Sequence, residues 1–517
     1  MQSHRDLWAS AQQCEERGAL GEARTLYETI LAGEPRHVPA RLRMARLEQL
    51  ADRYLTAKEH LWRAVDAVRE HGSTRHMGYV TARLLQFAEE AEVAALIKSV
   101  DWSDPHVVRQ SPVLAQHLWL AGDYQAALSF LDAMTHQVPA HHLLTFTRAN
   151  VLRYLGDMEA ADRAYEACLA LSPDFPDAHW AVATHSKAQP PLARVQRIRD
   201  ALSRVTPNGI EEAHLCYALF REYDAADDRD EAWSALSRGA EIMSRQLAFD
   251  SPLEASRFES LMQLPVSAPT FVTDSEIVPV FILGMPRTGT TLLDRIVGNH
   301  SAVTSLGERN DFSAAVSEAS GHFFRSPLHG DRLQLIADLD FARVGRLYEL
   351  RLQQLAEGKR YVIDKNPQNL FNLPLILQSL PEARVLCLQR DPMDACFSNL
   401  KELFQADAYG YSYALDDLAD HCLRVRRWMK HWQTQAPDSV RIVSYEDLVR
   451  SPEQTTAGVL DFLGLDQQSG LHEITRNSAP VATASSSQVR ENIHERGIGA
   501  WKRYERQLQP LRERLGT

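Results

Sequence analysis

The sequence has few cysteines, no long apolar run and no excess of basic residues. Six of its 517 residues are cysteine, and no two form a C-x-x-C pair, which predicts buried thiols rather than structural disulfides or a metal site. No stretch approaches the roughly 20 consecutive apolar residues of a membrane helix. The first residues also lack the basic and apolar segments of a secretory signal. We therefore expect a cytoplasmic protein with no membrane span and no bound metal.

The bulk composition predicts a globular protein with more than one domain. The chain has 517 residues, and a single hydrophobic core stops growing at about 250–300 residues. Hydrophobic residues make up 44% and charged residues 24% of the chain, as in ordinary globular proteins. The formal net charge of −12 argues against a general nucleic-acid binder, which needs a basic surface.

The N-terminal half carries a repeat with a period of 34 residues. The same step joins Gly122 to Gly156, Ala127 to Ala161, and Pro139 to Pro173. Earlier in the chain it joins Ala23 to Ala57. Small residues at one phase of such a repeat let two helices approach, while a Gly-Asp turn joins them and a proline follows the second.

This repeat resembles the tetratricopeptide repeat (TPR). The resemblance implies an all-α solenoid that presents a surface for a peptide or protein partner. A spacer and a self-association surface are equally compatible with it. We predict a helical array over residues 1–250, a linker over 251–276, where turn residues gather, and a second domain over 277–517.

The second half begins with a strand, a glycine-containing loop and a helix. Residues 278–283 form a β-branched apolar run, 284–291 form the loop, and helical spacing follows. This arrangement points backbone N–H groups at an anion. The spacing matches G-x-x-x-x-G-K-[ST], but Thr290 stands where a triphosphate-binding loop has its lysine. Arg287 supplies a positive charge within the loop.

Later strands predict an α/β domain with a mostly parallel sheet. Apolar runs at 303–306, 361–364, 383–388 and 440–443 alternate with helical patterns at 373–380, 395–404 and 415–433. Ligands of such sheets bind at the carboxyl ends of the strands.

The loop resembles the 5′-phosphosulfate loop of sulfotransferases that use PAPS (3′-phosphoadenosine 5′-phosphosulfate). The form in this chain is closest to that of the tyrosylprotein sulfotransferases and their bacterial relatives. The whole layout resembles a bacterial group of TPR sulfotransferases. The resemblance implies a P-loop-like sulfotransferase domain that binds PAPS and releases PAP (3′-phosphoadenosine 5′-phosphate). The loop residues expected to bind the donor are Pro286, Arg287, Thr288, Gly289, Thr290 and Thr291.

The resemblance also assigns roles to residues outside the loop. It makes Glu308 the general base for the acceptor hydroxyl, and it places Lys365 and Arg287 as cations that stabilise the charge developing during transfer. Arg390 and Ser398, eight residues apart, resemble the pair that binds the 3′-phosphate. Alternative interpretations are a solvated loop carboxylate for Glu308, and ion pairs with neighbouring aspartates for Lys365 and Arg390.

The C-terminal segment resembles the donor-binding strip of the same family. Seven basic and four acidic residues lie between positions 490 and 514, which suits an anionic donor. Ser485 is expected at the 5′-phosphosulfate, while Arg490, Trp501 and Lys502 are expected to close over the nucleotide. A solvated amphipathic tail is the alternative. Tyr445 is either a residue that faces the adenine or a core tyrosine.

Two rival functions and the acceptor stay open. A nucleotide kinase or NTPase is favoured by residues 361–364, which resemble the strand whose final Asp holds Mg²⁺, and is disfavoured by Thr290. The second rival is a repeat scaffold whose α/β domain is inactive. The acceptor hydroxyl is compatible with a protein tyrosine, a sugar or a small molecule.

Overall fold

The structure is a computed structural model, and it consists of two compact units. The described residues are 4–186, 190–264, 271, 275–329, 332–404, 407–477, 479–480 and 490–516. The first unit comprises Met1–Val151 and Asn310–Arg325, and the second comprises Leu152–Arg309 and Ser326–Thr517. Within the described ranges, no helix has both the length and the apolar character to cross a membrane.

The first unit is helical, and its successive helices pack as pairs, α1 with α2 and α3 with α4. The helices in chain order are α1 (His4–Glu16), α2 (Leu20–Gly33), α3 (Val38–Leu50), α4 (Tyr54–His71), α5 (Met77–Gln86), α6 (Glu90–Ser99), α7 (Pro105–Arg109), α8 (Ser111–Leu120), α9 (Tyr124–Met134) and, later in the chain, α18 (Asp311–Ser320). Helix α10 (His142–Leu155) spans the limit between the units. Ala23 and Ala57 are completely buried, so the small residues of the repeat do face a helix partner.

The repeated Gly-Asp pairs make the turns between helices. Gly122 has a φ of 80°, which glycine adopts without strain. Asp123 follows it and caps α9, because its side chain accepts a hydrogen bond of 3.0 Å from the backbone N–H of Ala126. Asp157 caps α11 (Met158–Leu171) in the same way. The expected helix pairs are therefore present, and their assignment to the TPR class stays a prediction.

Residues 310–325 follow the second strand of the sheet in sequence but fold with the N-terminal helices. The Phe323 ring contacts the rings of Tyr54 and Phe87, with centroids 5.1 Å and 5.6 Å away. Asp52 accepts a 2.8 Å hydrogen bond from the backbone N–H of Phe323. An aromatic cluster and a backbone hydrogen bond therefore hold this segment in the first unit.

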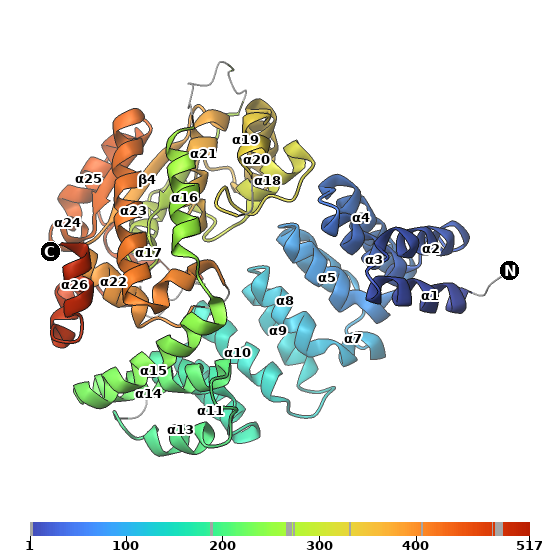
Figure 1. The fold of residues 1–517 in the computed structure, drawn as a ribbon, viewed down its shortest axis with the longest axis horizontal. Helices are drawn as coiled ribbons and strands as arrows, with labels where there is room; N and C mark the ends of the chain where they lie inside the picture. Colours follow the sequence, from blue (N-terminus) through green and yellow to red (C-terminus); the bar gives the residue numbers. More distant parts are fainter. Residues whose placement is uncertain are drawn as a thin grey trace. The chain divides into compact units, whose positions relative to one another are not determined.

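The second unit begins with helices and continues into a sheet flanked by helices (Figure 1). Its helices before the sheet are α11, α12 (Pro176–His185), α13 (Val195–Leu202), α14 (Ile210–Ala225), α15 (Arg229–Leu247) and α16 (Ser251–Met262). The helices among and after the strands are α17 (Thr290–Gly298), α19 (Leu333–Ala337), α20 (Phe341–Leu355), α21 (Leu373–Ser379), α22 (Pro392–Leu400), α23 (Leu415–Gln435), α24 (Tyr445–Arg450), α25 (Pro452–Leu463) and α26 (Gln509–Leu515).

The sheet has five parallel strands in the order β2-β3-β1-β4-β5. They are β1 (Val278–Leu283), β2 (Val303–Ser305), β3 (Tyr361–Asp364), β4 (Arg384–Gln389) and β5 (Val440–Ser444). All five strands predicted from the sequence are therefore confirmed. Every residue of β1 is buried, as expected for the central strand of a parallel sheet covered on both faces.

Helices cover both faces of β1. On one face, Val280 and Ile282 pack in a core with residues of α17, α24 and α25, including Leu293. On the other face, Phe281 stacks on Tyr348 of α20, with ring centroids 5.6 Å apart. Strand β1 has β3 on one side and β4 on the other, so the loop that follows it lies where the strand order reverses, the usual ligand position in such sheets.

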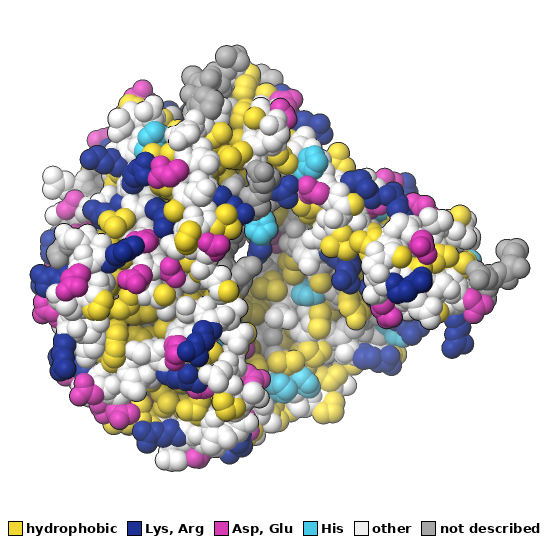
Figure 2. Space-filling model, in the orientation of Figure 1, with side chains coloured by type: hydrophobic (Ala, Val, Ile, Leu, Met, Phe, Trp, Pro, Cys, Tyr) yellow, Lys and Arg dark blue, Asp and Glu magenta, His cyan; other side chains and the backbone are white. Residues whose placement is uncertain are grey.

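Charged side chains do not gather by sign on the visible surface. On the face drawn in Figure 2, basic and acidic side chains are interspersed. The net charge of −12 is thus not concentrated in one patch on that face.

Candidate active site

The loop after β1 is held in a conformation that requires glycine at two positions. A Cβ on Gly284 would lie 2.9 Å from the Leu388 carbonyl oxygen, and a Cβ on Gly289 would lie 2.5 Å from Cδ2 of Tyr445. Gly289 has a φ of 100° and, as the residue before α17, has no side chain that could cap this helix. The first N–H groups of α17 are therefore not capped by the residue that precedes the helix, which suits an anionic ligand.

Arg287 is a strained and buried residue of this loop. Its φ is 67°, in a region that costs a residue with a side chain about 1–2 kcal/mol, and such strain is common at functional sites. The side chain is 8% exposed, and its Nε lies 3.8 Å from Oε2 of the buried Glu402. Burial lowers the pKa of Arg287 despite the opposing effect of Glu402.

Two further contacts brace the loop from within and from α22. Oγ1 of Thr288 donates a 2.7 Å hydrogen bond to the carbonyl of Met285. Nδ2 of Asn399, on α22, donates a 2.8 Å hydrogen bond to the carbonyl of Pro286. The Thr288 hydroxyl thus holds the loop's own backbone.

The predicted base and the predicted lysine form an ion pair. Nζ of Lys365, directly after β3, lies 2.6 Å from Oε1 of Glu308. Lys365 is 1% exposed, whereas the side chain of Glu308 is 39% exposed. A backbone hydrogen bond of 3.0 Å from Lys365 to the carbonyl of Gly307 continues the strand pairing beyond β2. The pair therefore lies at the carboxyl edge of the sheet.

Arg390 follows β4 and faces the loop and the C-terminal segment. Its Nη1 donates a 2.8 Å hydrogen bond to the carbonyl of Arg287, and its Nη2 donates to the carbonyl of Gly497. Its guanidinium carbon lies 4.6 Å from the ring centroid of Tyr445. The buried Nε of Arg390 has no hydrogen-bond partner among the described residues, and such an atom normally has one.

Ser398 lies two turns along α22 and lines the same pocket as Arg390. No hydrogen bond to its hydroxyl occurs within the described part of the chain, although the residue is buried. Tyr445 begins α24 directly after β5, and burial raises its pKa.

The C-terminal segment is attached to α22 by Asp394. This buried carboxylate accepts hydrogen bonds of 2.6 Å from the backbone N–H of Gly499 and 3.2 Å from that of Trp501. Burial raises the pKa of Asp394, while the two N–H donors and Arg390 oppose that effect. The backbone of the segment is thereby fixed beside Arg390.

The predicted strip residues lie in different surroundings. Nη2 of Arg490 donates a 3.0 Å hydrogen bond to the carbonyl of Tyr154, at the end of α10. Trp501 lies 5.8 Å beneath the guanidinium of Arg512, and Lys502 is exposed. Ser485 lies outside the described residues. The role of these four residues in donor binding stays a prediction.

One cavity of about 510 Å³ collects most of the predicted site residues. Its lining includes Pro286, Arg287, Gly289, Thr290, Thr291, Glu308, Arg390, Ser398 and Tyr445. Thr288, Lys365, Arg490, Trp501 and Lys502 are not part of that lining. Among the described residues, no group of three or more His, Cys, Asp or Glu side chains is placed to hold a metal ion.

The cavity also has a wall that sequence reasoning missed. Thr184 and His185 from the end of α12, Arg221 from α14 and Lys401 at the end of α22 all line it. His185 contacts Arg153, and burial lowers the pKa of its ring well below the usual range. No motif in the repeat region marks α12 or α14 as part of a site. Arg221 is one of several charged residues on α14, so its charge alone gave no distinct signal.

The site can bind a ligand with several anionic groups and remove a proton beside it. The N-terminus of α17, Arg287 and Arg390 favour anions. Glu308 is a partly exposed carboxylate in the same cavity. Phe404 and Tyr409, with ring centroids 4.7 Å apart, supply apolar surface to the lining.

Comparison with known proteins identifies the C-terminal region. The family model described as "Sulfotransferase family" matches residues 279–469. An uncharacterized protein of Aquifex aeolicus is 26% identical over 405 residues, which are 75% of this chain and 52% of that protein. Nodulation protein NoeE of Sinorhizobium fredii is 27% identical over 218 residues, 36% of this chain and 50% of that protein. The chain thus spans about half the length of these two relatives.

Protein-tyrosine sulfotransferase 1 of Danio rerio is 25% identical over 248 residues, which cover 45% of this chain and 67% of that protein. Among solved structures, the sulfotransferase domain of the Synechococcus PCC 7002 olefin synthase is 21% identical, covers 46% of this chain and 91% of that chain, and has a TM-score of 0.33. The C-terminal region of this chain therefore carries a sulfotransferase-family domain, and a helical N-terminal region precedes it.

Proposed function

We propose that this protein transfers a sulfuryl group from PAPS to an acceptor hydroxyl, with Glu308 as the general base. The observation that carries the proposal is that one cavity contains both the phosphate-type loop after β1 and the carboxylate of Glu308. The sulfotransferase-family match over residues 279–469 supports the reaction class. A protein tyrosine, a sugar and a small molecule all remain candidate acceptors.

The polar groups around the cavity suit the donor. Residues 286–291 and the N-terminus of α17 would receive the 5′-phosphosulfate. Arg390 and Ser398 would receive the 3′-phosphate, and the buried Nε of Arg390, without a partner among the described residues, supports a ligand there. Tyr445, stacked on Arg390, would face the adenine.

In the proposed step, Glu308 receives the acceptor proton through Oε2, because Oε1 is paired with Lys365. The acceptor oxygen forms a bond to sulfur while the bond from sulfur to the bridging oxygen breaks, so PAP leaves with the electron pair. Lys365 and Arg287 would stabilise the negative charge that develops on the transferred group and the leaving oxygen. No metal takes part in this proposal.

The buried environment of Asp364 argues against the kinase alternative. Its Oδ2 accepts a 2.9 Å hydrogen bond from the hydroxyl of Tyr348, and the residue is 2% exposed. A carboxylate engaged inside the core is poorly placed to hold Mg²⁺ through water.

We also propose that the helical N-terminal region is a TPR array that binds a protein partner or another copy of the chain. The completely buried repeat alanines support this assignment. The cytoplasmic location expected from the sequence belongs to the same proposal.

Calorimetry and a labelled-transfer assay test the proposed function. PAP should bind the protein, whereas ATP with Mg²⁺ should not bind more tightly than PAP. With radiolabelled PAPS and a panel of hydroxyl acceptors, Glu308→Gln should lose about 100-fold or more of the transfer rate, the usual share of a general base, and should still bind PAP. Glu382→Gln, at an exposed position, is the matched control. A Glu308→Gln variant with full activity would remove this residue as the base, and absence of PAP binding would overturn the donor.

A further inference from the structure

The C-terminal end of α22 is held by α14, a helix of the N-terminal region of the chain. The buried hydroxyl of Tyr217 donates a 2.9 Å hydrogen bond to the carbonyl of Leu400. Nη2 of Arg221 donates a 2.8 Å hydrogen bond to the carbonyl of Lys401. The last carbonyls of a helix have no partner inside it, so α14 fixes the end of α22 where Lys401 leaves the helix.

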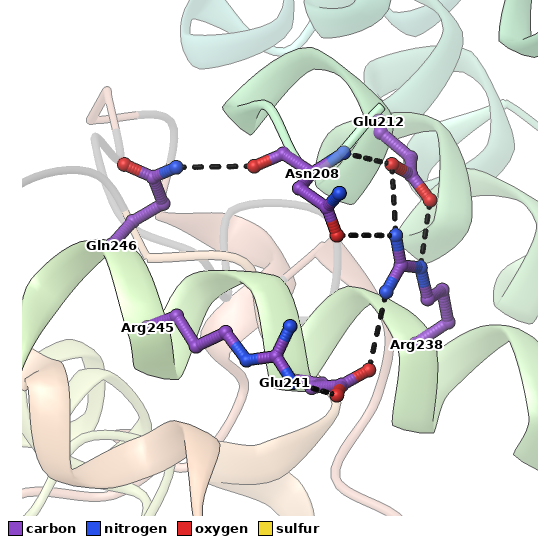
Figure 3. Close-up of polar contacts among 6 residues, drawn as sticks. All are labelled: Asn208, Glu212, Arg238, Glu241, Arg245 and Gln246. Carbon is purple, nitrogen blue, oxygen red and sulfur yellow. Dashed lines mark hydrogen bonds and ion pairs between the residues drawn. The ribbon is translucent and has the colours of Figure 1, made fainter. Parts of the chain in front are cut away.

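Helix α14 is itself firmly seated, as Figure 3 shows. Arg238 of α15 reaches both carboxylate oxygens of Glu212 on α14, at 2.7 Å and 3.1 Å. The same guanidinium donates to the side chain of Asn208, just before α14, at 2.9 Å. This bidentate pairing gives the two helices a defined register, and α14 can therefore position the residues that it contacts.

Lys401 lies on the cavity wall with Ser398 and Arg390. It follows Ser398 by three residues, and side chains three apart on a helix share one face. Its Nζ lies 4.9 Å from the ring centroid of Phe397, which holds the ammonium near that face. Among the described residues, no carboxylate forms an ion pair with Lys401, in contrast to Arg221 and Arg287, which both pair with Glu402.

The carboxylates near Lys401 are already engaged by other groups. Oε2 of Glu402 lies 3.4 Å from Nη2 of Arg221 and 3.8 Å from Nε of Arg287, so one carboxylate serves both guanidinium groups. Asp394, on the same helix, is engaged by the backbone of the C-terminal segment. Lys401 is therefore a half-buried cation without an ion-pair partner among the described residues, which suits an anionic ligand.

We infer that Lys401 binds the 3′-phosphate of PAPS and PAP together with Arg390 and Ser398, and that α14 of the helical region holds Lys401 in place. This inference rests on the proposed function and deepens it. A phosphate monoester carries a charge near −2 at neutral pH, and Arg390 with Lys401 matches that charge. The helical region then supplies part of the donor site.

Lys401 also makes PAP binding depend on pH. The charged groups that act on Lys401 are Arg221, Asp224, Arg287 and Arg390. Burial, followed by the repulsion of Arg221, lowers the pKa of Lys401 to about 8. Binding of the phosphate restores the charged form, so PAP affinity is full below pH 8 and falls above it. Between pH 7 and 9 the loss should be about tenfold.

Calorimetry with PAP and 5′-AMP tests the inference, because the two ligands differ only in the 3′-phosphate. Lys401→Met should bind PAP about 30-fold more weakly, the loss expected for one charge-assisted hydrogen bond, and should bind 5′-AMP as the wild type does. Lys401→Arg should retain most of the preference for PAP and lose the pH dependence between 7 and 9. Lys430→Met, at an exposed position on α23, should change neither ligand.

Three results are distinguishable. An unchanged PAP affinity in Lys401→Met overturns the inference. Equal losses for PAP and 5′-AMP, or a melting temperature that falls together with both affinities, also overturn it, because the effect is then general. A wild-type protein that binds PAP no better than 5′-AMP instead contradicts the donor assigned under the proposed function.

Discussion

Substitution of Gly289 by alanine should damage donor binding through two separable effects. The residue has a φ of 100°, and an alanine in this region costs about 1–2 kcal/mol in backbone strain. The new Cβ would also lie 2.5 Å from Cδ2 of Tyr445. Because ordinary contacts between carbon atoms begin near 3.5 Å, the ring must move by about 1 Å.

Movement of the Tyr445 ring disturbs its contact with Arg390, whose guanidinium carbon lies 4.6 Å from the ring centroid. A cation–π contact of this kind contributes about 0.5–2 kcal/mol. Strain and ring displacement together predict a loss of about 2–3 kcal/mol in PAP binding for Gly289→Ala, a Kd increase of roughly 30- to 150-fold. Gly289, Tyr445 and Arg390 all line the cavity, so the penalty is expected in PAP affinity.

A double-mutant cycle separates the two effects. In a Tyr445→Ala background the ring is absent, so Gly289→Ala should cost only the backbone strain, and the coupling energy should reach about 1 kcal/mol. Calorimetric titration with PAP provides the four affinities. Gly298→Ala is the matched control, since its Cβ would lie 3.7 Å from the Cβ of Ser305, an ordinary contact. A Gly289→Ala variant with wild-type PAP affinity, or with no coupling to Tyr445, would refute the geometry of the loop.

Two further predictions concern contacts around α22. Arg221→Gln removes a guanidinium whose repulsion is, next to burial, the largest cause that lowers the pKa of Lys401. The pKa of Lys401 should therefore rise in this variant, and the pH at which PAP affinity begins to fall should move above 8. The exposed control Arg199→Gln should leave that pH unchanged, and an unchanged pH in Arg221→Gln would contradict the prediction. Asp394→Asn weakens a charge-assisted attachment of the C-terminal segment, worth about 1.5–3 kcal/mol. Trypsin should therefore cut that segment about tenfold faster or more, whereas equal cleavage would show that Asp394 does not hold it.

The phosphate-type loop and the strands could be predicted because their signals are local. An apolar run such as 278–283 favours burial, and all of its residues are buried. The glycines at 284 and 289 indicate a backbone that approaches other atoms closely. Each of these features can be recognised from a short segment of the sequence, without knowledge of distant residues. The five strands, and the parallel sheet that they form, follow from such features once helical segments separate them.

The wall formed by α12 and α14 could not be predicted, because its role depends on contacts across the sequence. The hydrogen bond from Arg221 to the carbonyl of Lys401 joins residues 180 positions apart. On α14 alone, Arg221 is one charged residue among many on repeat helices. Lys401 likewise lies only three residues after Ser398, the last residue of the predicted 3′-phosphate pair. Its role depends on which carboxylates lie near it in the fold, and the local sequence does not show this.

The predicted linker over 251–276 illustrates the same limit in another way. The prediction used the local gathering of turn residues. That composition indicates where regular helices stop, but it does not indicate which distant residues form hydrogen bonds with each other. The second compact unit starts at Leu152, and Tyr217 and Arg221 satisfy carbonyls at the end of α22. A buried carbonyl that loses its donor costs about 1–3 kcal/mol. The end of the helix that carries Ser398 therefore depends on residues that precede the predicted linker, and in energetic terms α14 belongs with the sulfotransferase-family domain.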